Sequence, residues 1–254
     1  MIMKHLLYVA SLIALTSCTL NINFMHEIGN GTSVETAIET GDFNSISSCC
    51  SIDVHYSQQA GKQSVILTCD ENLVEFFDIR VEDGTLVVDT KSGVSISTRV
   101  KTFVTVSSPK LDGAFASGSG DIEISGPLTT DGDFTFKTSG SGDIDAEGLV
   151  VCKGFSASIS GSGSIDVDGV QAQAASFKST GSGDIDVESL KAEDVSVRMS
   201  GSGDISLHCN GAGYIDANLS GSGDLNLSGS ARSVISNTSG SGRVRSGNLT
   251  IIRE

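Results

Sequence analysis

The sequence predicts an all-β protein in which one chain winds into a parallel β-solenoid with coils of about 20 residues. The tripeptide Gly-Ser-Gly recurs at intervals of 19 to 22 residues, starting at Gly118, Gly140, Gly161, Gly181, Gly201, Gly221 and Gly240. Four residues after each start stands an aliphatic residue: Ile122, Ile144, Ile165, Ile185, Ile205, Leu225 and Val244. Apolar residues also alternate before the turns, as in Phe134 and Phe136. This period of 2 indicates strands with one buried face, and coils about 4.8 Å apart would stack these side chains into a continuous core.

Each Gly-Ser-Gly is expected to form a tight turn between two strands. Glycine adopts positive φ without a steric penalty, and we expect this freedom to let the chain reverse within three residues. The predicted turn glycines are Gly118, Gly120, Gly140, Gly142, Gly161, Gly163, Gly181, Gly183, Gly201, Gly203, Gly221, Gly223, Gly240 and Gly242.

The first 17 residues are typical of a signal peptide. Lys4 and His5 precede an apolar run, residues 6–15, that is too short to cross about 30 Å of hydrocarbon as a helix. The run ends in Leu15-Thr16-Ser17-Cys18, which resembles the lipobox of bacterial lipoproteins. We therefore expect Cys18 to be acylated and to hold the mature chain on a membrane. The alternative is an ordinary cleaved signal followed by an incidental cysteine.

The mature chain divides by pattern into a tether and one long domain. Residues 18–36 contain Gly29-Asn30-Gly31 and suit a tether. Residues 37–254 are expected to form one superhelix, with irregular first coils and a cap over 37–110 and repeat coils over 111–254. Only residues 71–79 could hold a short helix. A cap is expected because an open solenoid end exposes an edge strand.

Five cysteines remain after Cys18, so they cannot all pair within one chain. Cys49 or Cys50 could form a bridge with Cys69, and the sequence leaves this open. Cys152 and Cys209 are interpreted as small buried apolar residues. The spacing predicts no zinc site.

Both halves of the mature chain carry a family resemblance. The front half contains Asp42-Phe43-Asn44-Ser45-Ile46, Ser51-Ile52-Asp53-Val54-His55-Tyr56 and Val104-Thr105-Val106-Ser107-Ser108-Pro109, and the back half contains the Gly-Ser-Gly array. In this order the motifs resemble the GIN-domain family, described as auto-transporter adhesin heads and common in Bacteroidetes. The resemblance implies a pectin-lyase-like superhelix of two sheets with Gly-Ser-Gly at the turn between them. It implies adhesion as the role and carries no catalytic residues.

The charge balance limits the partners. The chain has 16 Lys and Arg against 31 Asp and Glu, a formal charge of −15. Nucleic acid is excluded as a partner because phosphate neutralisation needs a basic face.

Two acidic columns follow the turns on the outward side. The first contains Asp121, Asp143, Asp184, Asp204 and Asp224, and the second contains Glu123, Asp145, Asp166 and Asp186. Oxygen ligands at such spacing suit Ca²⁺, so one hypothesis is that these columns bind calcium or another ligand. The other hypothesis is a solvated face whose Asp residues cap turns. No other metal and no organic cofactor is predicted.

A second polar column precedes the turns. Lys137, Lys178 and Arg198 share it with Ser158 and Asn218. It is either a basic strip suited to an anionic glycan or a solvated strand surface that limits edge-to-edge association.

Catalysis finds little support in the residues. The histidines of the mature chain, His26, His55 and His208, form no nucleophile–base grouping. Acid pairs such as Asp143 and Asp145 could mimic a glycosidase dyad, yet nearly every coil repeats them, whereas an active site is singular.

We therefore expect a non-catalytic lipoprotein of the cell envelope, lipid-anchored on the outer membrane, whose solenoid surface binds a glycan or a host or matrix protein. Only Tyr56 and Tyr214 remain for stacking on a sugar. Two alternatives stay open. One is a polysaccharide lyase or glycoside hydrolase on the same scaffold, and the other is a periplasmic structural or signalling accessory. The sequence does not decide which membrane face carries the protein.

Overall fold

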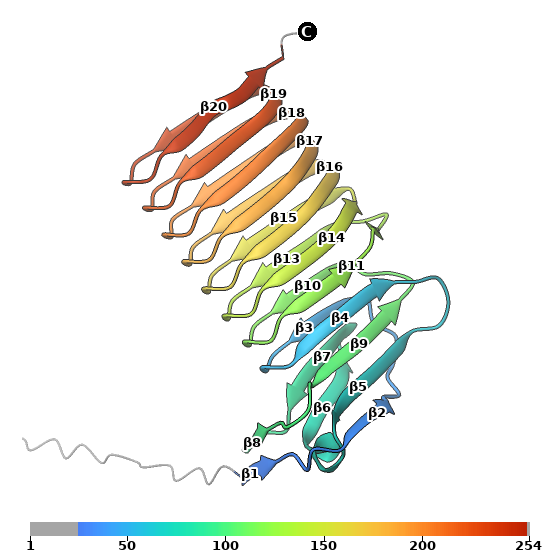
Figure 1. Cartoon of the computed structure of the whole chain (residues 1–254). Coiled ribbons are helices and arrows are strands. Elements are labelled where there is room, and N and C mark those ends of the chain that lie inside the picture. Colours follow the sequence, from blue (N-terminus) through green and yellow to red (C-terminus); the bar gives the residue numbers. More distant parts are fainter. Residues whose placement is uncertain (1–24, 253–254) are drawn as a thin grey trace, which may run out of the picture.

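The computed structural model describes residues 25–252, which form a tall stack of coils closed at the N-terminal end by a small cap (Figure 1). The predicted signal peptide and Cys18 lie outside the described residues. The predicted β-solenoid with coils of about 20 residues is confirmed. Within residues 25–252 no helix has the length and apolar composition needed to cross a bilayer.

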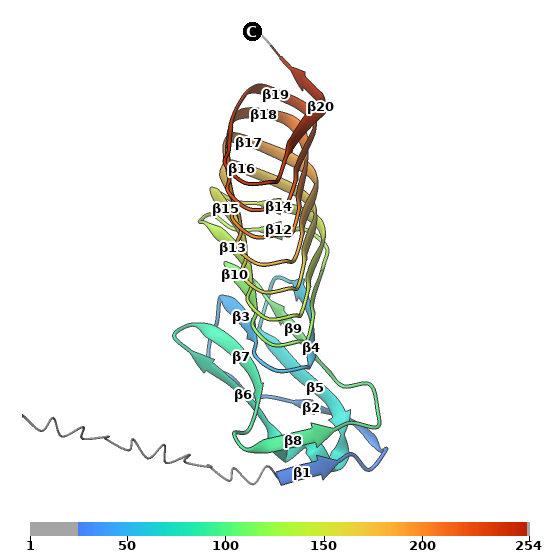
Figure 2. The same cartoon turned by 90° about the vertical axis from the view of Figure 1, so that its left-hand side faces the viewer.

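Two faces of parallel strands enclose the core of the repeat coils (Figure 2). Face A, which follows the Gly-Ser-Gly turns, contains β11 (Ile122–Ser125), β12 (Leu128–Thr129), β14 (Ile144–Val151) and β20 (Val244–Ile251). Face B, which precedes them, contains β10 (Gly113–Ala116), β13 (Phe134–Thr138) and β15 (Gly154–Ile159). Four long strands bend across both faces: β16 (Ile165–Ser179), β17 (Ile185–Met199), β18 (Ile205–Leu219) and β19 (Leu225–Thr238).

The strand register places equivalent residues of successive coils directly above one another. Ile144 pairs with Ile165, Ile165 with Ile185, and Ile185 with Ile205. These four side chains are at most 1% exposed. Burying an aliphatic side chain of this size contributes about 1.5–3 kcal/mol. The apolar columns that run along the stack therefore supply the main contribution to the stability of the coils. The prediction of an aliphatic core is therefore correct.

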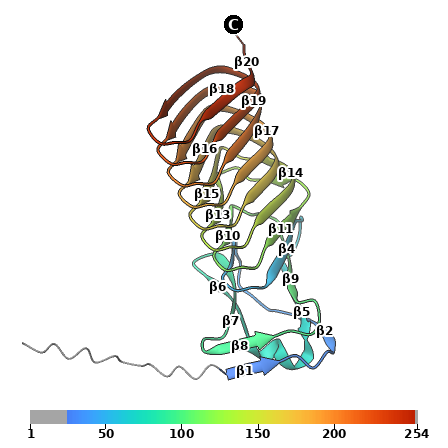
Figure 3. The same ribbon diagram turned by 60° about the vertical axis from the view of Figure 1, so that its left-hand side comes forward.

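The turn glycines are required for a different reason from the one we expected. The turns lie above one another along one edge of the stack (Figure 3), and none of their glycines has a positive φ. Instead, the amide of Ser182 donates to the carbonyl of Gly161 at 3.0 Å, and the amide of Ser202 donates to Gly181 at 2.9 Å. A Cβ on Gly183 would lie closer than 3.0 Å to the backbone of Gly163 in the coil below. Only glycine allows the turn backbones to approach this closely.

The first coils do not follow chain order. The coil of β3 (Ser45–Ser48) and β4 (Asp53–Gln58) lies between the coil of β7 (Thr85–Thr90) and β9 (Phe103–Ser108) and the coil of β10 and β11. The chain therefore builds one coil, adds the next coil beneath it, and then returns to continue the stack. The sequence analysis assigned irregular first coils to this region but did not predict their order, because no repeat marks which of these strands pair.

The cap is built from antiparallel strands that cover the open end. β5 (Ser64–Asp70) pairs with β9, β2 (Ser33–Ala37) pairs with β5, and β6 (Phe77–Glu82) pairs with β7, all antiparallel. A 3₁₀ helix, η1 (Glu71–Phe76), follows β5, where we expected a short helix. β1 (Met25–Ile28) pairs with β8 (Val94–Ser97). Residues 25–28 and 33–36, which we assigned to a tether, are thus in strands of the cap.

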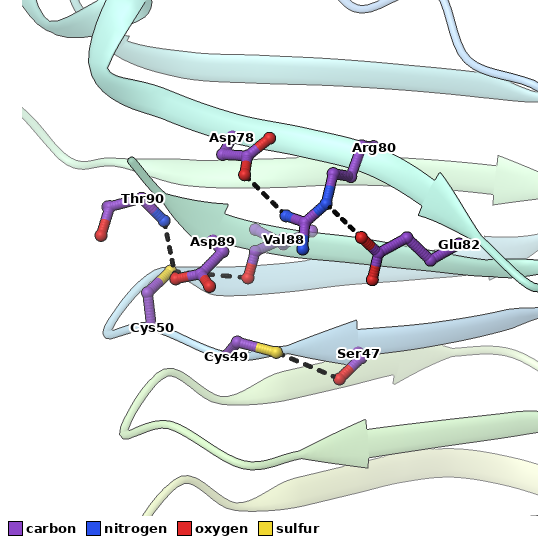
Figure 4. A network of polar contacts seen from close by, with 9 residues as sticks. All are labelled: Ser47, Cys49, Cys50, Asp78, Arg80, Glu82, Val88, Asp89 and Thr90. Carbon is purple, nitrogen blue, oxygen red and sulfur yellow. Dashed lines mark hydrogen bonds and ion pairs between the residues drawn. The ribbon is translucent and has the colours of Figure 1, made fainter. Parts of the chain in front are cut away.

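The five described cysteines are all free. Cys69, Cys152 and Cys209 are buried, as predicted for the last two, and the bridge considered for Cys69 is not formed. Figure 4 shows Cys49 beside Ser47, whereas the thiol of Cys50 points to the carbonyl oxygen of Val88. Burial raises the pKa of the Cys50 thiol to about 11, so this thiol stays protonated at neutral pH.

Candidate ligand-binding surface

The first acidic column is part of the scaffold. The carboxylate of Asp121 accepts a hydrogen bond from the backbone amide of Asp143 at 2.9 Å, and that of Asp143 accepts one from Ser164 at 2.6 Å. Asp184, Asp204 and Asp224 each bond in the same way to the amide one coil further on. These carboxylates satisfy backbone donors at the start of each face A strand. One oxygen of each carboxylate therefore bridges neighbouring coils, which gives this column a structural role.

The second acidic column faces solvent and lines a shallow hollow. This hollow of about 280 Å³ is lined by Asp145, Ala146, Glu147, Asp166, Val167, Asp168, Asp186 and Glu188. Burial, and then the charges of Asp145 and Asp186, raise the pKa of Asp166 to about 6. Burial likewise raises the pKa of Asp145 and of Asp186. The like charges thus repel one another across neighbouring coils.

The acidic side chains are not arranged as a metal centre. Across residues 25–252, no group of three or more His, Cys, Asp or Glu side chains is placed to hold a metal ion. The first acidic column is engaged with backbone amides, and the second is spread along the face. The geometry therefore gives the calcium hypothesis no ligand set.

Face B carries the predicted basic column. The register aligns Lys137 with Ser158, Ser158 with Lys178, Lys178 with Arg198, and Arg198 with Asn218. The lysines and the arginine are exposed. The guanidinium of Arg198 donates to the hydroxyl of Ser196 at 3.0 Å, on the neighbouring outward column of the same strand.

A hollow on face B lies beside this basic column. Its volume is about 450 Å³, and its outward lining residues are Asp133, Thr135, Gly154, Ser156, Ala174, Ser176, Asp194, Ser196, Tyr214 and Asp216. The residues between these outward positions, Phe134, Phe155, Ala175 and Val195, also border it, and their side chains are buried in the core. A volume of this size is within the range of small-molecule sites, about 300–1,000 Å³.

The two tyrosines that we singled out have different environments. Tyr56 is buried, and its hydroxyl lies 2.9 Å from that of Ser108, so it is not available to a ligand. Tyr214 is 59% exposed and lines the 450 Å³ hollow. The sequence analysis did not select Asp133, Asp194 or Asp216, although the repeat alignment places all three at outward positions.

The histidines form no catalytic grouping with these residues. His208 is exposed, and its Nδ1 lies 3.0 Å from the hydroxyl of Ser228. The Nδ1 of His55 lies 2.9 Å from a carboxylate oxygen of Glu123, and its ring packs against Phe103. His26 is in β1, in the cap.

The fold and this surface define a single-chain β-solenoid with a ligand-sized hollow on one outer face. The chain belongs to the family described as "Putative auto-transporter adhesin, head GIN domain", whose sequence model matches residues 42–231. The family assignment made from the motifs is therefore confirmed.

Solved structures show the same architecture. A "putative adhesin" from Bacteroides fragilis NCTC 9343 is 25% identical, with a TM-score of 0.76, and covers 86% of this chain and 98% of its own. A "putative lipid binding protein" from Parabacteroides distasonis ATCC 8503 is also 25% identical, with a TM-score of 0.72 and coverage of 86% and 99%. A "putative adhesin" from the same strain is 25% identical, with a TM-score of 0.64 and coverage of 87% and 99%. No curated protein matches the chain.

Proposed function

We propose that this protein is a non-catalytic adhesin of the cell envelope, held on the outer membrane by acyl chains on Cys18 and binding its ligand through face B. The 450 Å³ hollow on a rigid strand face is the observation that carries this proposal. Side chains on paired strands are held in place before a ligand arrives, which lowers the entropic cost of binding. Membership of an adhesin family and similarity to solved adhesin-like structures support the same role.

The position of the cap agrees with an N-terminal anchor. β1 begins at Met25 in the cap, and the coils extend away from it toward the C-terminal end (Figure 1). Six residues, 19–24, separate Cys18 from Met25, and the seven residue-to-residue steps between them span at most about 25 Å. An anchor at Cys18 would therefore keep the cap near the membrane and direct the coils away from it.

Membrane fractionation tests the anchor. In the wild type we expect the protein in the outer-membrane fraction, and in the Cys18→Ala variant we expect it in the soluble fraction, because the acyl chains bind the bilayer. The matched control is Cys49→Ala, which removes an exposed cysteine outside the lipobox and is expected to stay membrane-bound. Retention of Cys18→Ala on the membrane would refute the anchor.

Surface exposure and binding separate this proposal from its two rivals. Protease treatment of intact cells should degrade an adhesin, whereas a periplasmic accessory would survive. The purified chain should be retained on surfaces coated with glycan or matrix protein without releasing product. Release of new reducing or unsaturated sugar ends would instead identify a glycoside hydrolase or a polysaccharide lyase. Protein that survives shaving and binds neither type of surface would refute the adhesin role.

A further inference from the structure

The face B hollow exists because two of its columns change side-chain size along the stack. In the first column, Gly154 pairs with Ala174, Ala174 with Asp194, and Asp194 with Tyr214. The two small residues leave a depression below the larger Asp194 and Tyr214. At the opposite end stands Asp133, whose Oδ1 would lie 2.7 Å from a Cβ on Gly154. The depression is therefore bounded by side chains at both ends of the column.

The hollow spans five strands, β13, β15, β16, β17 and β18. Adjacent strands lie about 4.8 Å apart, so its length along the stack is about 19 Å. This elongated hollow, called the trough below, is suited to a short linear ligand that lies along the stack, across the strands.

The second outward column of the trough supplies hydroxyl groups. Ser156 pairs with Ser176, Ser176 with Ser196, and Ser196 with Asp216. Hydroxyls donate and accept hydrogen bonds, and carboxylates accept them. The trough therefore presents a row of mixed hydrogen-bond donors and acceptors along the stack.

Tyr214 adds an exposed aromatic ring at one end of this row. Its side chain is 59% exposed, although aromatic rings gain free energy by leaving water. The adjacent carboxylates are available: across residues 25–252 the side chain of Asp194 has no hydrogen bond or ion pair, and Asp216 accepts only from Asn218, at 3.2 Å. An apolar ring face beside unsatisfied acceptors matches a ligand that has one apolar face and a rim of hydroxyls.

We propose that this trough binds a neutral glycan, with one pyranose ring stacked on Tyr214 and its hydroxyls donating to Asp194 and Asp216. The proposal rests on the adhesin function and names the ligand class for the same face. The carboxylates at both ends repel an anionic chain. The neighbouring column of Lys178 and Arg198 disfavours a cationic one. An extended peptide would lack backbone partners, because the strand ladders already pair the backbone of this face.

Glycan-array binding followed by titration calorimetry tests the proposal with the full mature chain. The array carries neutral oligosaccharides and, as a second arm, oligosaccharides that contain uronic acid. We expect saturable binding to a neutral oligosaccharide and roughly tenfold or greater loss of affinity in Tyr214→Ala, since exposed aromatic anchors dominate such sites. Tyr214→Phe should retain most of the affinity, because it keeps the ring.

Two further variants test the trough itself. Ala174→Arg fills its centre from an exposed position and should abolish binding. Gln171→Arg, exposed on the same strand but outside the lining, adds the same charge and should bind like the wild type. Leu149→Ala removes an exposed apolar residue of face A and serves as the control for Tyr214→Ala. Circular dichroism confirms that each variant is folded.

The outcomes separate this proposal from the adhesin function on which it rests. Binding of neutral glycan that both Tyr214→Ala and Ala174→Arg leave intact would overturn the trough. Binding of only uronic-acid glycans would overturn the neutral ligand. If the chain binds matrix protein but no glycan, the adhesin function stands and the glycan proposal fails. If it binds neither, both fail.

Discussion

Replacing Gly183 by alanine tests the reason for the glycine turns. The new Cβ would lie closer than 3.0 Å to the backbone of Gly163, and backbone cannot rotate away as a side chain can. The turn must move apart from the coil below, which weakens the hydrogen bonds from Ser182 to Gly161 and from Thr180 to Ile159. Two such bonds contribute about 2 kcal/mol together, and forcing extra atoms into packed structure costs about 1–3 kcal/mol more. We expect a loss of about 3–5 kcal/mol.

Thermal denaturation followed by circular dichroism measures this loss. For a chain of this length each kcal/mol lowers Tm by roughly 2–4 °C, so Gly183→Ala should lower Tm by about 10 °C. The control is Gly41→Ala, because a Cβ at Gly41 meets nothing within 4 Å. We expect its Tm to stay close to that of the wild type. If Gly183→Ala and Gly41→Ala both had the Tm of the wild type, close approach of the turn backbones would not be the reason for glycine at the turn positions.

Three further predictions concern stability. Ile185→Ala should destabilise the protein by about 2–5 kcal/mol in urea denaturation, because it leaves a cavity in the aliphatic column; a loss below about 1 kcal/mol would contradict the stacked core. Asp166→Asn should raise the free energy of unfolding at pH 7, because burial and the neighbouring carboxylates raise the pKa of this carboxyl from 3.8 to about 6. Solvent screens this exposed group, so we expect a gain of only about 1 kcal/mol. Protonation already removes that repulsion at low pH, so the gain should shrink as pH falls from about 6 to below 4, and a gain independent of pH would contradict it. Asp70→Asn should loosen the cap: burial raises the pKa of this carboxyl, but amide hydrogen bonds from Arg99, Gly31 and Val100 outweigh burial and lower it. The stability it contributes should therefore be present at neutral pH and be lost as pH falls below about 4, and equal acid sensitivity of wild type and variant would refute this role.

The repeat made the coils predictable because the same pattern of buried and exposed residues recurs in every coil. Aligning the Gly-Ser-Gly copies assigned Ile144 and Ile165 to the core, and both are fully buried. The order of the first coils was not predictable, because the pairing of β3 with β7 and of β3 with β10 joins segments that share no repeat. The role of the turn glycines was also misjudged, since close approach between coils depends on the stacked structure rather than on the local chain.

The sequence predicted which residues form outward columns, but it did not predict the hollows on the surface. The outward position of the acidic residues followed from the period of 2, but the hydrogen bond that the Asp143 carboxylate accepts from the amide of Ser164 in the next coil required coordinates. The hollow depends on Gly154 and Ala174 lying between Asp133 and Tyr214 in register. A column-by-column comparison of outward side-chain size would have indicated it, because small residues flanked by large ones leave space on a regular strand face.

The most direct measurement is a titration of the full mature wild type and its Ala174→Arg variant with the best-bound oligosaccharide of the array, with products analysed afterwards. We predict a saturable isotherm for the wild type, no isotherm for Ala174→Arg, and an oligosaccharide recovered uncut. Equal binding by both proteins, or a cleaved oligosaccharide, would contradict a non-catalytic adhesin that binds through face B.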